Sequence, residues 1–153
     1  GFLQIQAAAA ALLLLPVWLA ASSPRALGWP DALAVAVALV AVLGEGVADR
    51  QLQAFRADPG NHGRVCDSGL WAWSRHPNYV FEWLHWWAYP LLAIGTGWGL
   101  LALVGPAFMY WLLVHVSGIP PLEAQMLRSR GDAYRAYQQR VNAFLPFPKG
   151  STR

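Results

Sequence analysis

The stretch from Gly69 to Glu82 holds a dense group of polar side chains, around the run Arg75-His76-Pro77-Asn78, at the start of an apolar segment that runs on to Gly95. Pro77 predicts the start of a helix, because proline lacks the N–H that would be unpaired at the first helical position. Arg75 and His76 then stand at the positive end of the helix dipole, where free N–H groups attract an anion. The stretch therefore predicts an anion-binding site.

The predicted helix carries further polar groups into an apolar segment. Asn78, Glu82 and Trp86 share one face at spacings of four residues, with His85 beside them. A charge at bilayer depth costs about 2.5–3.5 kcal/mol, so an acid there indicates a functional site. Glu82 is accordingly a candidate site residue, whereas shallow burial with bonds to backbone would give it a purely structural role.

Basic and amide groups elsewhere supply the chemistry of a nucleotide site. Guanidinium groups match phosphate with two parallel hydrogen bonds, which makes Arg56, Arg64 and Arg75 candidate phosphate ligands. Asp49 and Asn78 suit ribose hydroxyls and a carboxamide. Taken singly, each arginine is explained equally well as a charge that sets membrane topology.

The composition indicates a membrane protein. Of 153 residues, 56% are hydrophobic and only 12% are charged, against about 25% charged in a soluble domain. The nine Trp residues agree, since Trp gathers where bilayer meets water. The net charge of +3 comes from bases that flank apolar runs, so we expect membrane lipid rather than nucleic acid as the partner.

Metal and disulfide chemistry have little support. Cys66 is the single cysteine, so no intramolecular disulfide can form. No His-x-x-x-His or His-x-x-His-His box is present for a di-iron centre, and we predict no metal site.

The apolar runs predict an all-α fold, a polytopic transmembrane helical bundle of about four membrane segments with a C-terminal amphipathic surface helix. A span needs roughly 20 residues. The expected segments are Phe2–Ala21, Ala32–Ala48 (continuing as helix to Phe55), Pro77–Gly95 and Trp98–Val116, and the surface helix is Pro121–Val141. We expect residues 1–153 to form a single membrane domain. The first residue is Gly, not Met, so we expect an N-terminal portion of the natural chain to precede it. A signal peptide is the rival reading of the first run, but no Lys or Arg precedes it.

The basic residues predict an orientation. Of 11 Lys and Arg residues, only Arg25 lies outside Arg50–Arg75 and Arg128–Arg153. The chargeless Gly95–Gly99 turn joins the third and fourth segments as a hairpin, which puts both basic regions on one side. By the positive-inside tendency that side, with the site and the C-terminus, is cytoplasmic.

Several sequence motifs of this chain resemble those of a bacterial membrane family of unassigned function, which is grouped with the steroid 5-alpha-reductases by a shared C-terminal domain. The resemblance rests on Cys66-Asp-Ser-Gly-Leu-Trp71, Ser74-Arg-His-Pro-Asn-Tyr79, Trp86-Trp87, Ser117-Gly-Ile-Pro-Pro-Leu-Glu123 and Tyr134-Arg-Ala-Tyr137. It covers nearly the whole chain and implies a location in the bacterial inner membrane.

Steroid 5-alpha-reductases are membrane helical bundles that bind NADPH on the cytoplasmic side and reduce a carbon–carbon double bond conjugated to a carbonyl. The resemblance implies cofactor contacts at matching positions, namely Asp49, Arg56, Arg64, Asn78, Glu82, Trp86 and Tyr137. Those enzymes keep their substrate-polarising acids in an N-terminal half that has no counterpart here, so no catalytic residue is assigned. The reductases keep a basic residue near the position of Val141, so Arg140, one residue earlier, matches it only with a gap in the alignment.

A second family shares part of the pattern. Isoprenylcysteine carboxyl methyltransferases and related phospholipid methyltransferases also have an Arg-His-Pro-x-Tyr block, and they bind S-adenosylmethionine. Their later segment is similar to Glu123, Leu127, Gly131, Tyr134, Tyr137 and Pro146. The shared scaffold therefore leaves the cofactor open.

The leading prediction is a membrane-embedded, NADPH-dependent reductase of a conjugated double bond in a steroid- or lipid-like substrate. Glu82 would orient the nicotinamide end and Trp86 would pack on it, with Arg75 and His76 at the helix start. The alternatives are an S-adenosylmethionine-dependent methyltransferase of a lipid or prenylated acceptor, and a non-catalytic membrane subunit.

Overall fold

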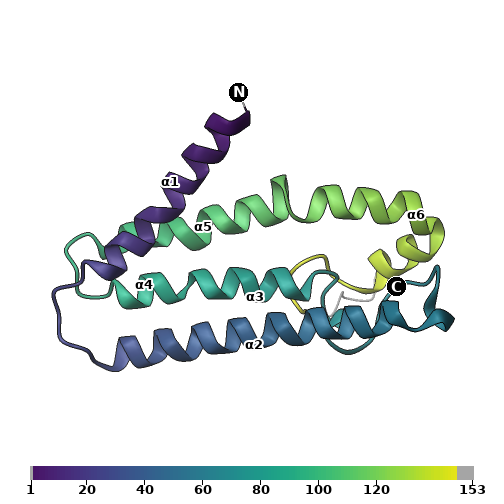
Figure 1. Ribbon diagram of the computed structural model, residues 1–153, viewed down its shortest axis with the longest axis horizontal. Coiled ribbons are helices and arrows are strands. Elements are labelled where there is room, and N and C mark those ends of the chain that lie inside the picture. The colour runs from purple at the N-terminus through teal and green to yellow at the C-terminus, as the bar shows by residue number, and fades with distance from the viewer. Residues whose placement is uncertain (1, 148–153) are drawn as a thin grey trace. The chain divides into compact units, whose positions relative to one another are not determined.

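The computed structural model describes residues 2–147, apart from the side chains of Phe2, Leu3 and Ile5. Within this range it contains helices and no strand, and Ser74 and Asn142 form an isolated parallel bridge. The elements are α1 (Phe2–Ala21), α2 (Trp29–Ala57), η1 (Pro59–Asn61), η2 (Gly69–Ala72), α3 (Pro77–Trp86), α4 (Ala88–Leu92), η3 (Gly99–Leu103), α5 (Val104–Trp111), the π-helical turn η4 (Leu112–Val116) and α6 (Ile119–Arg140) (Figure 1). The predicted all-α class is confirmed. The C-terminal residues 148–153 lie outside the described part.

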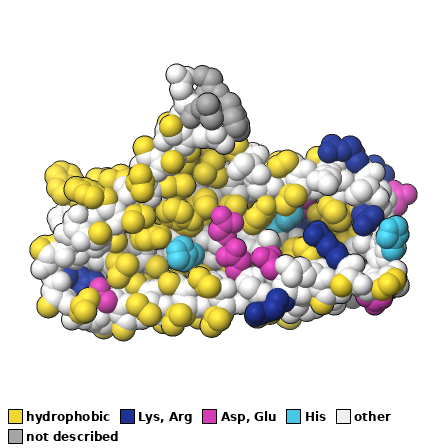
Figure 2. Space-filling model, viewed as in Figure 1, with side chains coloured by type: hydrophobic (Ala, Val, Ile, Leu, Met, Phe, Trp, Pro, Cys, Tyr) yellow, Lys and Arg dark blue, Asp and Glu magenta, His cyan; other side chains and the backbone are white. Residues whose placement is uncertain are grey.

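Two helical runs are long and apolar enough to cross a membrane, Trp29–Ala57 and Gly99–Arg140. Only 17% and 22% of the residues in their most apolar windows are buried, whereas the core helix of a soluble protein is mostly buried. The apolar part of the second run ends before Gly118, because α6 carries six charged residues. Figure 2 shows hydrophobic side chains over much of the surface along the helices. Of the two other predicted segments, the first contains the shorter apolar helix Gln6–Ala21, and the third forms the helices α3 and α4.

The described chain divides into two compact units. The first unit comprises residues 2–41 and 83–111. Its core is Leu19, Ala93 and Ala102, and α1 packs at Pro16 so closely on Gly105 that a Cβ there would come within 2.9 Å of the proline ring. The absence of a side chain at Gly105 allows α1 and α5 to approach here.

The second unit comprises residues 42–82 and 112–147. It contains the end of α2, the connection with η1 and η2, the start of α3, and α6. Its core is Tyr134, Tyr137 and Val141, with Val65, Met126 and Leu127 against it. All the predicted site residues except Trp86 belong to this unit.

A glycine turns α6 back on itself within this unit. Gly131 has φ 51° and ψ −121°, a conformation that side chains with a Cβ rarely adopt. The helix that was expected to be continuous from Pro121 to Val141 is therefore kinked (Figure 1). The reversal places Tyr134 and Tyr137 in the core, together with Met126 and Leu127 from before the kink.

Candidate functional site

The start of α3 is tied to the segment that follows α6. Ser74 is almost fully buried, and its Oγ donates to the carbonyl of Phe144 at 2.6 Å while accepting from the backbone N–H of His76 at 3.1 Å. The backbone N–H of Arg75 donates to the carbonyl of Asn142 at 2.9 Å. The predicted helix start at Pro77 is confirmed, and these bonds hold its position.

The guanidinium of Arg75 lies inside this arrangement. Only 8% of its side chain is exposed, and its Nε donates to Glu123 Oε1 at 2.6 Å. Its Nη1 donates to the carbonyls of Gln138 and Val141. A buried charge is tolerated only when it is paired and hydrogen-bonded, and Arg75 meets that requirement through α6.

Glu123 is the shared acceptor of this cluster. Its carboxylate accepts from His76 Nε2 at 3.3 Å, from the Tyr134 hydroxyl at 3.3 Å and from Gln138 Nε2 at 2.8 Å. Burial alone would raise the pKa of Glu123, but the hydrogen bonds from His76 and Arg75 and the charge of Arg75 outweigh it and lower the pKa to about 2. The carboxylate is therefore ionised at neutral pH.

The buried tyrosines are hydrogen-bonded within the protein. The Tyr137 hydroxyl donates to the carbonyl of Trp71, and Trp71 Nε1 in turn donates to the carbonyl of Ala48 on α2 at 3.0 Å. Burial raises the pKa of Tyr137, and burial followed by the charge of Glu123 raises the pKa of Tyr134 to about 12. Neither hydroxyl is suited to give up a proton near neutral pH.

A pocket of about 400 Å³, here called the large pocket, lies among these elements. Its size falls in the range of about 300–1,000 Å³ that is usual for small-molecule sites. Six of the nine predicted cofactor-binding residues line it, namely Asp49, Arg56, Arg75, His76, Asn78 and Tyr137. The end of α2, the start of α3 and both parts of α6 thus meet at one cavity.

Asn78 gives the large pocket an unsatisfied acceptor. Its Oδ1 is buried and has no hydrogen-bond partner within the protein. A buried polar atom left unpaired costs about 1–3 kcal/mol, so a donor on a bound molecule would recover that energy. A carboxamide or amino N–H group of a nucleotide fits this requirement.

Three predicted residues lie elsewhere. Arg64 lines a neighbouring smaller pocket, and Glu82 is one turn beyond Asn78 on α3 without lining the large pocket. Trp86 belongs to the first unit, where its ring lies 5.4 Å from that of Tyr89. Their cofactor contacts remain predictions.

The structural role of Glu123 was not predicted. One feature of the sequence could have indicated this role. Glu123 is the only acidic residue between Glu82 and Asp132, so a buried base that pairs with this part of the chain can pair only with Glu123. Gln125, Leu122 and Met126 also line the large pocket and were likewise not predicted.

No group of three or more His, Cys, Asp or Glu side chains within residues 2–147 is arranged to hold a metal ion. Cys66 lines the large pocket, and burial raises the pKa of its thiol, which disfavours a thiolate nucleophile.

Comparison with known proteins identifies the family to which the chain belongs, but that family has no assigned activity. No curated protein and no solved structure matches it. A family model described as "Protein of unknown function (DUF1295)" matches residues 1–141. That match covers most of the sequence, and the chain belongs to this family.

Proposed function

We propose that the protein is a membrane-embedded reductase that uses NADPH to reduce a carbon–carbon double bond conjugated to a carbonyl in a steroid- or lipid-like substrate. The observation that carries the proposal is the large pocket, where Asp49, Arg56 and Asn78 converge from two helices. The apolar, largely exposed helices support a location in the membrane, where such a substrate dissolves.

The residues present fit a dinucleotide. The Asp49 carboxylate suits ribose hydroxyls, the Arg56 guanidinium suits a phosphate, and Asn78 Oδ1 accepts from a carboxamide N–H. When bound, NADPH supplies the hydride, while the pocket binds the nucleotide, orients it and excludes water. Arg75 and Glu123 act as positioning residues, because they hold the start of α3 against α6.

The methyltransferase alternative draws on one observation. The Arg75 guanidinium already donates to Glu123 and to two backbone carbonyls, which leaves Arg56 as the only other arginine that lines the large pocket. S-adenosylmethionine carries no phosphate and needs fewer arginines. This second candidate is a methyltransferase of a lipid or prenylated acceptor.

Thermal unfolding of the detergent-purified full chain separates the candidates. Ligand at 100 times its dissociation constant stabilises a protein by about 2.7 kcal/mol, so the cofactor that binds raises the Tm. We expect NADPH to raise the Tm of the wild type and to raise that of Asn78→Leu by less. The control is Gln139→Leu, whose Tm should rise as in the wild type, because Gln139 is exposed and lines neither the large pocket nor the neighbouring smaller one. Stabilisation by S-adenosylmethionine alone would replace the reductase with the methyltransferase. Stabilisation by neither would favour the non-catalytic subunit.

A further inference from the structure

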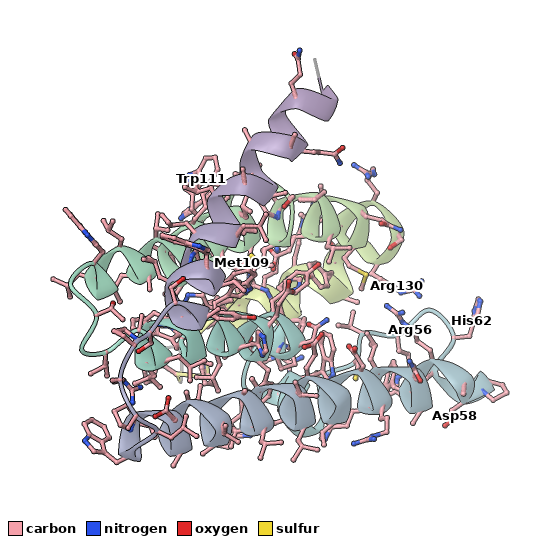
Figure 3. All side chains as sticks on the ribbon, turned by 60° about the vertical axis from the view of Figure 1, so that its left-hand side comes forward. Arg56, Asp58, His62, Met109, Trp111 and Arg130 are labelled. Atoms are coloured by element: carbon pink, nitrogen blue, oxygen red, sulfur yellow. The ribbon has the colours of Figure 1, made fainter. Side chains whose placement is uncertain are left out.

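A smaller pocket, here called the side pocket, has a strongly basic lining. Its volume is about 130 Å³, and its charged lining residues are Arg56, Arg64 and Arg130, with His62 beside them. None of its lining residues is Asp or Glu. Figure 3 shows Arg56 and Arg130 close together, with His62 on the loop nearby and Asp58 on the opposite side of α2. Three guanidinium groups around so small a space repel one another unless an anion lies between them.

Arg130 carries the clearest sign of a ligand. Its Nε is buried and has no hydrogen-bond partner within the protein. A guanidinium N–H removed from water without an acceptor is unfavourable, and the unpaired donor belongs to a residue that lines the pocket. Among the described residues, Arg56, Arg64 and Arg130 form no ion pair with a carboxylate.

The loop that carries Arg64 is internally bonded. Arg64 Nη1 donates to Asn61 Oδ1 at 3.3 Å, and Asn61 Nδ2 donates to the carbonyl of Phe55 at 3.1 Å. The nearby acid, Asp58, accepts from the backbone of Gly60 at 2.8 Å and caps η1. Asp58 therefore stabilises the loop and does not neutralise the arginines of the side pocket, so an anionic ligand can pair with them.

We propose that the side pocket binds a phosphate monoester, with Arg130 as a phosphate ligand. A monoester carries close to two negative charges and three oxygens, which matches several guanidinium forks better than a diester does. The side pocket shares Leu52, Arg56, Cys66 and Met126 with the large pocket, so one ligand can occupy both. Building on the proposed function, we assign the monoester to the 2′-phosphate of the nucleotide, which makes Arg130 a determinant of preference for NADPH over NADH.

The test uses probes that lack nicotinamide. Adenosine 2′,5′-bisphosphate and ADP-ribose, which carries a pyrophosphate diester but no monoester, are titrated into the detergent-purified full chain, as wild type, Arg130→Gln and Arg128→Gln. Arg128 is the matched control, because it is exposed on the same helix and lines neither pocket. We expect Arg130→Gln to weaken binding of the bisphosphate by about 10- to 100-fold, with little change for ADP-ribose and none for either probe in Arg128→Gln. If Arg130→Gln does not fold, Arg64→Gln replaces it in the comparison with wild type, because Arg64 lines the same pocket from an exposed loop.

The outcomes separate the side pocket from the reductase proposal. Bisphosphate binding that depends on Arg130, without a rise in Tm on addition of NADPH, supports the side pocket and counts against the reductase. The side-pocket proposal is overturned, whether or not NADPH binds, if the wild type binds neither the bisphosphate nor a short-chain phosphatidic acid, or if Arg130→Gln binds both with the affinity of the wild type. A short-chain phosphatidic acid is the lipid arm. If its binding, and not that of the bisphosphate, depends on Arg130, the source of the monoester is a lipid and the nucleotide assignment is overturned.

Discussion

At the scale of single residues, Arg75 and Glu123 form the interaction on which the site depends. The two side chains are 8% and 15% exposed, and their closest atoms are 2.6 Å apart. Breaking a buried pair by removing one partner is costly, because the remaining charge stays buried without compensation. Arg75 was predicted as a phosphate ligand, and its hydrogen bonds give it a structural role as well.

Neutralising Glu123 should destabilise the protein strongly. We expect Glu123→Gln to lower the free energy of unfolding by about 3 kcal/mol, since Arg75 would lose its counter-charge. Asp132→Asn is the control on the same helix. Its ion pair with Arg135 is 95% and 67% exposed, and such pairs contribute little. Thermal unfolding followed by circular dichroism makes the comparison, and equal shifts in the two variants would contradict the role of Glu123.

The same carboxylate should make stability depend on pH in the acid range. The pKa of Glu123 is lowered from 4.5 to about 2, so between these values the unfolded chain binds a proton that the folded chain does not. Its contribution is fully present above about pH 4.5 and is lost as pH falls toward 2. Tm measured across this range should fall more steeply for wild type than for Glu123→Gln. Parallel curves would show that Glu123 is not the group that titrates.

At the scale of elements, α6 depends on its glycine. A Cβ at Gly131 would meet no atom within 4 Å, so the cost of a side chain there comes from the backbone, which has φ 51°. We expect Gly131→Ala to destabilise the protein by about 1–2 kcal/mol. The control is Gly46→Ala in α2, where the nearest atom to the new Cβ is 3.9 Å away and helix propensity favours alanine by up to about 1 kcal/mol. Thermal unfolding distinguishes them, and a neutral Gly131→Ala would mean that the turn in α6 does not require glycine.

Local rules in the sequence predicted the elements better than their interactions. The start of α3 at Pro77 and the continuation of α2 beyond Ala48, expected to Phe55 and observed to Ala57, follow from short-range signals and were anticipated. The turn at Gly131 was not, because an isolated glycine is also tolerated inside a helix. The pairing of Arg75 with Glu123 spans 48 residues, and nothing local to either residue reveals the partner. The segment Trp98–Val116, which was predicted as one span, is observed as the three elements η3, α5 and η4. Hydrophobic periodicity does not distinguish 3₁₀, α and π geometry.

At the scale of the whole molecule, the apolar helices predict stable insertion in lipid. We expect the full chain, expressed in bacteria, to remain in the membrane fraction after an alkaline carbonate wash, because the two long apolar runs expose most of their residues. A peripheral membrane protein expressed in parallel should be released. Recovery of the chain in the soluble fraction would contradict membrane insertion.

The family to which the chain belongs carries no assigned activity, so the proposal depends on what occupies the large pocket. The most direct measurement is a cryo-EM or crystallographic map of the full chain with saturating NADPH. We predict density for the nucleotide in the large pocket, with a donor about 2.7–3.2 Å from Asn78 Oδ1. A map of that complex in which the large pocket is empty, or in which the nucleotide binds elsewhere, would contradict the account.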